Sequence, residues 1–220
     1  MSNKNKLSCS ECFLLNCYRH DKHFPGFCLT ETIEPGKIQK TKEQYTGQEA
    51  DLARIAAVVE GTYYGKLTRV EEAVAFAYRI NAQKIGIASC IGLIEETRIL
   101  TKILRTAGFE TFTVLCKVGS IDKTEMGVPE ELKLSRGSFE ASCNPILQAQ
   151  LLNEEKTDFN VVMGLCIGHD SLFFRHSEAP ATVLVVKDRV TGHNPAAALY
   201  TAKFYSKRLL DREYLKTLKG

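Results

Sequence analysis

The sequence predicts an α/β protein whose core is a doubly wound parallel sheet of four to five strands, preceded by a small cysteine-rich module. Two observations predict the sheet. Short apolar runs alternate with helical segments from residue 84 onward, and these runs are nearly continuous, as in parallel strands covered on both faces. A third observation separates the start, because residues 1–47 show neither helical nor strand periodicity. We therefore expect two domains, in residues 1–47 and 48–220.

Two helices are expected before the first strand. The segments QEADLARIAAVVEGTYYG (residues 48–65) and TRVEEAVAFAYRINA (residues 68–82) both carry apolar residues at helical spacing, and Gly61 is expected to end the first. Neither segment shows residues that indicate chemistry. Both helices are therefore expected to pack against each other or against the sheet.

Four strands then alternate with helices. The expected strands are KIGIAS, ETFTVLCKV, NVVMGLC and ATVLVVK, at residues 84–89, 110–118, 160–166 and 181–187. A long irregular stretch, residues 119–142, separates the second strand from the next helix and has the length of a lid. The last helix is expected to start at Pro195 and to run to about Leu218, since proline suits a first helical turn.

Right-handed crossovers favour the strand order 2-1-3-4 for this Rossmann-like pattern. In such open sheets, ligands bind beyond the carboxyl ends of the strands, where the order reverses. We call this edge of the sheet the rim. The sequence has no phosphate-binding loop and no G-x-G-x-x-G, which argues against the usual nucleotide-binding sites.

Several side chains with chemical potential are expected at the rim. The tripeptide Cys-Ile-Gly follows both the first and the third strand, and Asn-Pro follows a cysteine at one helix start and a histidine at another. A thiol near a helix N-terminus has a lowered pKa, which favours the reactive thiolate. The candidate catalytic residues are Cys90, Cys143, Cys166, His169 and His193, with Asp170 beside them and Cys116 below them.

A structural interpretation competes with this one. Cysteine is often a small buried hydrophobic residue, and Cys116 shares the parity of Phe112 and Val114 on its strand, which favours a place in the core. The two histidines could equally cap or hydrogen-bond loops. The coincidence of Cys90, Cys143 and Cys166 on one edge favours function for those three.

The N-terminal segment CSECFLLNCYRHDKHFPGFC has the spacing C-x2-C-x4-C-x10-C, with His20 and His23 between the last two cysteines. Four thiolates can complete a tetrahedral zinc site or hold an iron–sulfur cluster, and a bound metal could supply the folding free energy of a segment with so little core. The spacing predicts a metal without choosing between zinc and an iron–sulfur cluster. The predicted ligands are Cys9, Cys12, Cys17 and Cys28.

Several phrases resemble one family. The N-terminal cysteine group, CNPILQAQLLN, DFNVVMGLCIGHDSLFF and VVKDRVTGHNPAAALY together look like an uncharacterised family of cysteine-rich, predicted metal-binding proteins from bacteria and archaea, often anaerobes. The resemblance covers nearly the whole chain. It implies metal binding, with the four N-terminal cysteines as ligands, and an α/β body, but no established reaction.

Composition narrows the classes of partner. A net charge of +3 and a pI near 8.4 are too mild to indicate nucleic-acid binding. The start lacks a secretory signal, and no apolar run approaches the roughly 20 residues of a membrane-spanning helix. We expect a cytoplasmic protein that binds neither nucleic acid nor membrane. Because the cytosol keeps thiols reduced, we do not expect the eight cysteines to form structural disulfides.

Three functions remain open from the sequence. The first is a metal- or iron–sulfur-dependent redox or transfer enzyme acting on a small-molecule substrate or redox partner, with the histidines as acid–base groups. The second is a nucleophilic enzyme with Cys166 as nucleophile and His169 as base. The third is a non-enzymatic metal carrier, sensor or interaction protein.

Overall fold

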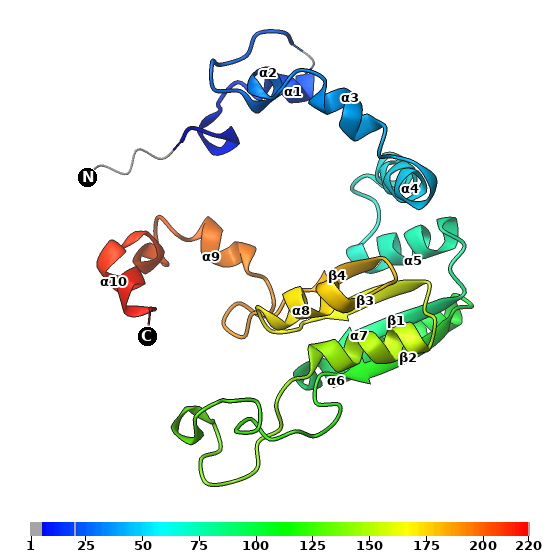
Figure 1. The fold of residues 1–220 in the computed structure, drawn as a ribbon, viewed down its shortest axis with the longest axis vertical. Coiled ribbons are helices and arrows are strands. Elements are labelled where there is room, and N and C mark those ends of the chain that lie inside the picture. The colour runs from blue at the N-terminus through cyan, green and yellow to red at the C-terminus, as the bar shows by residue number, and fades with distance from the viewer. Residues whose placement is uncertain (1–5, 20, 220) are drawn as a thin grey trace. The chain divides into compact units, whose positions relative to one another are not determined.

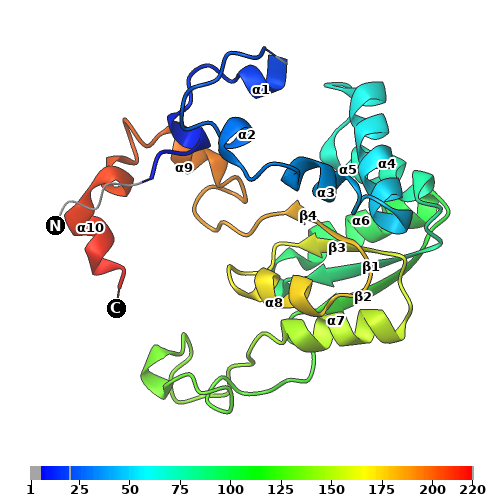
Figure 2. The same ribbon diagram turned by 45° about the horizontal axis from the view of Figure 1, so that its top comes forward.

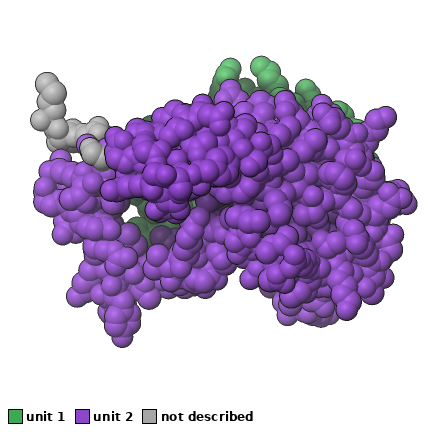
Figure 3. Space-filling model, turned by 90° about the horizontal axis from the view of Figure 1, so that it is seen from below, with its two compact units in different colours: residues 1–54 green, residues 55–220 purple. Residues whose placement is uncertain are grey.

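The structure is a computed structural model that describes residues 6–19 and 21–219. The chain divides into two compact units, residues 1–54 and residues 55–220, which Figure 3 colours separately. The boundary falls inside one helix, α4 (Gly47–Tyr63). The expected division at residue 47 therefore stays a prediction about folding. Within the described residues, no helix has the length and apolar character needed to cross a membrane.

The first unit consists of short helical pieces. In the described part of residues 1–46 these are η1, α1, α2 and α3, at Cys9–Glu11, Asn16–Arg19, Leu29–Thr32 and Lys37–Lys42. Asn16 is the one buried residue that these pieces contain, and its side chain donates a hydrogen bond to the carbonyl of His23. Hydrogen bonds between residues close in the chain therefore hold this segment, and apolar burial contributes very little.

The second unit contains a four-stranded sheet, as predicted. The strands are β1, β2, β3 and β4, at Lys84–Ser89, Glu110–Leu115, Phe159–Met163 and Ala181–Val185. All pairs are parallel and the order is β2-β1-β3-β4, so the predicted order 2-1-3-4 is confirmed. The sheet runs through the centre of this unit in Figures 1 and 2.

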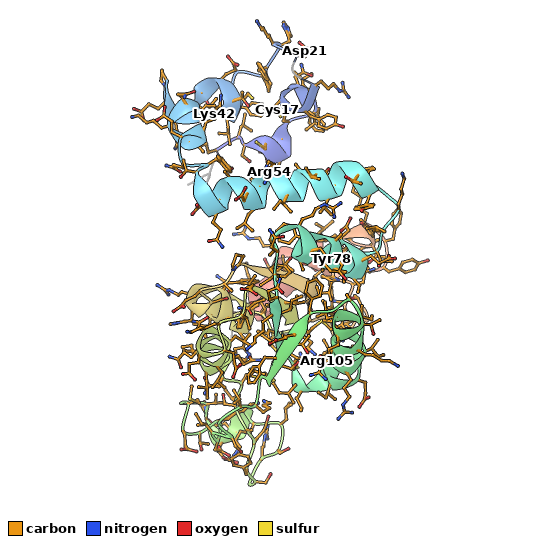
Figure 4. The ribbon with its side chains drawn as sticks, turned by 90° about the vertical axis from the view of Figure 1, so that its right-hand side faces the viewer. Cys17, Asp21, Lys42, Arg54, Tyr78 and Arg105 are labelled. Carbon is orange, nitrogen blue, oxygen red and sulfur yellow. The ribbon has the colours of Figure 1, made fainter. Side chains whose placement is uncertain are left out.

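Helices cover both faces of the sheet. One face carries α5 (Arg69–Arg79) and α6 (Ile94–Thr106), which pack on side chains such as Ile85 and Ile87. The other carries α7 (Pro145–Glu154) and α8 (His169–His176) over residues such as Ala88 and Val162. Figure 4 labels Tyr78 on α5 and Arg105 on α6. This is the doubly wound architecture that the alternation of strands and helices predicts.

Two details differ from the expectation. α4 continues through Gly61 to Tyr63, so that glycine does not end the helix. The single helix expected from Pro195 to Leu218 is instead three short pieces: α9, η4 and α10, at Ala196–Tyr200, Lys207–Leu210 and Arg212–Thr217. The break has a local cause, because Asp211 caps α10 by accepting hydrogen bonds from the N–H groups of Glu213 and Tyr214.

The stretch between β2 and α7 forms a long loop with its own internal contacts (Figure 1, green). It contains the short helix η3 (Glu130–Leu132), and its two arms meet in an antiparallel bridge between Asp122 and Ala141. The ammonium group of Lys133 is buried against Asp122 and Glu130. The loop therefore begins after β2, near Cys116, and ends before α7, at Cys143. The bridge between Asp122 and Ala141 joins its two arms.

Candidate functional site

Three cysteines meet where β1, β2 and α7 come together at the rim. Cys90 and Cys116 directly follow Ser89 and Leu115, the last paired residues of β1 and β2. Cys143 precedes Asn144, whose side chain caps α7. The backbone joins these ends, because the Cys116 N–H donates to the Ser89 carbonyl (2.7 Å) and the Asn144 N–H donates to the Cys116 carbonyl (2.8 Å).

The three thiols pack together with Cys116 in the middle, and we call them the thiol cluster. The N–H of Ile91, the residue after Cys90, donates to the Cys116 sulfur (3.4 Å). Hydrogen bonds from the Cys116 thiol lower the pKa of Cys90 to about 4 and that of Cys143 to about 5. The hydrogen bonds to Cys143 and Cys90, together with burial, raise the pKa of Cys116 well above its usual range. The cluster therefore holds one retained proton between two sulfurs that ionise readily.

Burial differs among the three thiols. Cys90 is 6% exposed and Cys116 only 2% exposed, and both belong to the apolar cluster under α7 and α8. Cys143 is half-buried. Burial alone would raise the pKa of a thiol, so hydrogen bonds and nearby cations must outweigh it at Cys90 and Cys143. Solvent reaches Cys143 more readily than the other two.

Basic side chains from two segments support the thiolates. After the Cys116 hydrogen bond, Lys187 and the Gly92 N–H also lower the pKa of Cys90. Lys117 does the same for Cys143, while its ammonium group also donates to the Ala141 carbonyl (2.6 Å). Lys187 lies against the turn after β1, with its Nζ 3.6 Å from where a Cβ on Gly92 would be. A larger side chain at Gly92 would therefore crowd this cation.

Cys166 lies at the same rim but bonds to a different group. Arg189 donates from Nη2 to the Cys166 sulfur at 3.3 Å. This bond, followed by the charges of Cys90 and Cys143, raises the pKa of Arg189. The Cys90 N–H also donates to the Met163 carbonyl (3.0 Å), which ties Cys90 to the strand that leads to Cys166. The rim thus carries all four of these cysteines. Cys90, Cys116 and Cys143 lie in the thiol cluster, and Cys166 is hydrogen-bonded to Arg189.

The two predicted histidines have different surroundings. The charge of His169 contributes to lowering the pKa of Cys143, and its Nδ1 is buried with no hydrogen-bond partner among the described residues. His193 is part of a tight loop: its N–H donates to the Asp188 carbonyl (2.7 Å), and its Nδ1 accepts from the Asp188 N–H (3.1 Å). Asp170 accepts from the N–H groups of Gly168 and Ser171 at the start of α8. The charge of His169 therefore acts on the thiol cluster, whereas the hydrogen bonds of His193 and Asp170 lie within their own turns.

The N-terminal cysteines are arranged differently. Cys9 and Cys17 are exposed, and Cys12 and Cys28 are half-buried (Figure 4 labels Cys17). His20 lies outside the described residues. In residues 6–19 and 21–219, no three His, Cys, Asp or Glu side chains are arranged to hold a metal ion, here or at the rim. As placed, these residues do not form a metal site.

Four site residues were not predicted from the sequence: Lys117, Gln148, Lys187 and Arg189. A signal for two of them was present, because Lys187 and Arg189 lie in VVKDR at the end of β4 and so had to reach the rim. Gln148, whose buried amide donates to the Ser89 and Val114 carbonyls next to the thiol cluster, gave no signal beyond being a polar residue among apolar neighbours on α7. The site is therefore more basic than cysteine spacing alone suggests.

Comparisons with known proteins identify a family and a relative of this chain. A family model described as "Protein of unknown function (DUF1847)" matches residues 28–184, which include the thiol cluster and Cys166 but not Cys9, Cys12 or Cys17. The "Uncharacterized protein MJ0455" of Methanocaldococcus jannaschii is 45% identical over 206 residues, covering 93% of this chain and 99% of that protein. The resemblance seen in the sequence is confirmed: the chain belongs to the DUF1847 family of proteins of unknown function.

Proposed function

We propose that this protein is a thiol–disulfide redox enzyme that acts on a small disulfide through the thiol cluster of Cys90, Cys116 and Cys143. One observation carries the proposal: the adjoining ends of β1, β2 and α7 bring three thiols together, with Cys116 between two thiols whose pKa is lowered. Thiol–disulfide exchange needs this pair of roles, a thiolate that attacks and a second thiol close enough to resolve the mixed disulfide.

Cys143 is the attacking thiolate, because it is the most accessible of the three and its pKa is about 5. Its sulfur attacks one sulfur of the substrate disulfide, the S–S bond breaks, and the first substrate thiolate leaves. The half-buried position of Cys143 favours a small substrate over a folded protein. Lys117 and His169 stabilise the negative charge on the Cys143 sulfur before the attack. The same cations stabilise the leaving thiolate after it.

Cys116 completes the exchange. It gives its proton to the departing thiolate and attacks the Cys143 sulfur, which breaks the mixed disulfide and releases the second half of the substrate as a thiolate. The products are a Cys116–Cys143 disulfide, one substrate thiol and one substrate thiolate that takes a proton from water, and an external dithiol must reduce the protein again. Cys90 can then exchange with this bond. Neighbouring parallel strands lie about 4.8 Å apart, within the roughly 4.4–6.8 Å between Cα atoms that a disulfide spans.

A redox titration tests the proposal. The full chain, prepared anaerobically, would be equilibrated in buffers of increasing disulfide-to-dithiol ratio, and its free cysteines alkylated and mapped by mass spectrometry. We expect one two-electron transition that removes Cys116 together with Cys143 or Cys90, while Cys166 stays alkylated. Cys116→Ala should abolish the transition, and Cys166→Ala should keep it. Absence of any disulfide within the thiol cluster would refute the proposal.

A second candidate function rests on the charge of His169, which contributes to lowering the pKa of Cys143. Here Cys143 is a nucleophile in a transfer reaction, and His169, whose buried Nδ1 lacks a partner, relays the proton. This differs from the pair of Cys166 and His169 that sequence proximity suggested. The two functions separate in one variant, because Cys116→Ala ends disulfide exchange but leaves a Cys143–His169 nucleophile present. Trapping of Cys143 by an acylating reagent in Cys116→Ala would favour the second function.

We further propose that Cys9, Cys12, Cys17 and Cys28 bind zinc or an iron–sulfur cluster. The support is their spacing and the small buried core of the segment that contains them. Binding would need these side chains to move together. Metal and acid-labile sulfide analysis after anaerobic purification distinguishes the two metals, and a preparation with neither would refute the proposal.

A further inference from the structure

Gln148 is a fully buried polar residue on the inner face of α7, directly behind the thiol cluster. Its side chain is 0% exposed, and its neighbours on the same face include Ala149 and Leu152, both also 0% exposed. An amide in such surroundings is costly to bury unless its hydrogen bonds are made. Its position five residues after Cys143 makes its contacts informative about the cluster.

The amide nitrogen of Gln148 joins the ends of two strands. Nε2 donates to the Val114 carbonyl at 2.7 Å and to the Ser89 carbonyl at 3.2 Å. Ser89 directly precedes Cys90, and Val114 lies two residues before Cys116. Because Gln148 itself belongs to α7, this one side chain links the three elements that carry the three thiols.

These hydrogen bonds are additional to the ones that the sheet already provides. The Ser89 carbonyl accepts the Cys116 N–H at 2.7 Å, and Val114 lies inside the paired β1–β2 ladder. The other polar atom of the amide, Oε1, is buried and has no hydrogen-bond partner within residues 6–19 and 21–219. An apolar side chain of the same shape would avoid that unpaired atom. Stability of the fold alone is therefore a poor account of a glutamine at this position.

We propose that Gln148 is a positioning residue, whose amide holds the ends of β1, β2 and α7 at the separation that keeps Cys116 packed next to both Cys90 and Cys143. The proposal concerns the same cluster as the proposed function. It does not require redox activity, because it is tested on the ionisation of the thiols. A failure of the redox titration would therefore leave this inference standing, and the reverse also holds.

The test compares Gln148→Met with Gln150→Met in the full chain. Methionine keeps the length and volume of glutamine without the amide, and Gln150 is an exposed glutamine on the same helix. The alkylation rate of Cys90 and Cys143 by iodoacetamide would be followed against pH by mass spectrometry, alongside the urea midpoint of unfolding. We expect Gln148→Met to lower both rates about fivefold or more near pH 6.5, in the sense of a raised thiol pKa, with the unfolding midpoint preserved.

The control Gln150→Met should change neither quantity. A purely structural role predicts the opposite result for Gln148→Met, a lower unfolding midpoint with unchanged alkylation of the folded protein, and that result would overturn the proposal. A measurement on the unmodified chain covers the case in which Gln148→Met fails to fold. The side-chain amide resonances of Gln148 should shift as Cys90 and Cys143 titrate, while those of Gln150 stay constant. Resonances of Gln148 that ignore the titration would equally refute the role.

Discussion

The two groups of cysteines in this chain differ in how they are brought together. Cys9, Cys12, Cys17 and Cys28 are close in sequence, yet they lie on short helical pieces with almost no buried residues. The members of the thiol cluster are 26 and 27 residues apart in sequence, at positions 90, 116 and 143, and a buried sheet gathers them.

The two groups of cysteines are organised by different causes. Local spacing can only provide ligands, and something outside the chain must draw them together. Topology can place distant side chains at one point with no ligand at all, because parallel strands bring their carboxyl ends to one edge. The N-terminal group should therefore depend on a metal for its order, and the thiol cluster should not. Each prediction below tests one side of this difference.

The largest expected effect is the loss of the N-terminal metal. Replacing Cys9 and Cys12 by serine should remove about one equivalent of metal and leave roughly the first 45 residues open to proteolysis, because the metal supplies their folding free energy. The α/β unit should keep its thermal unfolding transition. Limited proteolysis with metal analysis checks both statements, and full metal content with a protected N-terminus in the double variant would contradict the module.

The next effect is on the thiol cluster and needs no metal. Cys116→Ala removes the donor that most lowers the pKa of Cys90 and Cys143. Their alkylation near pH 6.5 should slow at least about tenfold, since a thiol that returns to the ordinary pKa of about 8.5 is only about 1% thiolate at that pH. Cys166→Ala is the matched control, because Cys166 is bonded to Arg189 outside the cluster. Equal rates in wild type and Cys116→Ala would show that topology gathers the sulfurs without coupling them.

The sequence predicted the thiol cluster in part, for reasons that follow from the fold. The strand order and the rim position of Cys90 and Cys143 came from crossover handedness and strand ends, which are rules of topology. The burial expected of Cys116 from strand parity is found, but its burial is combined with hydrogen bonds to both other thiols, so the core and functional interpretations are not exclusive.

Side-chain direction was beyond the reach of the sequence. Cys166 and His169 are three residues apart, yet the sulfur meets Arg189 while the charge of the imidazole acts on Cys143. Three residues across a turn do not determine which way each side chain points. The role of Gln148 also depended on distances between strand ends, which periodicity does not encode.

A smaller effect should distinguish the two thiolates within the cluster. Lys187 acts on Cys90 and Lys117 acts on Cys143, each after the Cys116 hydrogen bond. Lys187→Met should slow alkylation of Cys90 by a factor of about 2–5 and leave Cys143 nearly unchanged, and Lys117→Met should do the reverse, as expected for partly screened charges. Mass spectrometry after a short labelling pulse resolves both sites in one sample. Equal effects of each variant on both thiols would mean that the cluster responds only as a whole.

The smallest expected effect is on stability as a function of pH. The pKa of Cys143 is lowered to about 5 in the folded chain, from about 8.5 in an unfolded one. A lowered pKa contributes stability that is fully present above the unfolded value and is lost as pH falls through the folded value. The free-energy difference between wild type and Cys143→Ala should therefore shrink by on the order of 1 kcal/mol between about pH 8.5 and pH 5, allowing for solvent screening. Urea unfolding at several pH values measures it, with Ser142→Ala as a control whose difference should not depend on pH. A Cys143→Ala difference that is constant over this range would mean that the fold does not stabilise the thiolate. The thiol cluster would then differ from the metal-dependent N-terminal group in topology alone, and not in electrostatics.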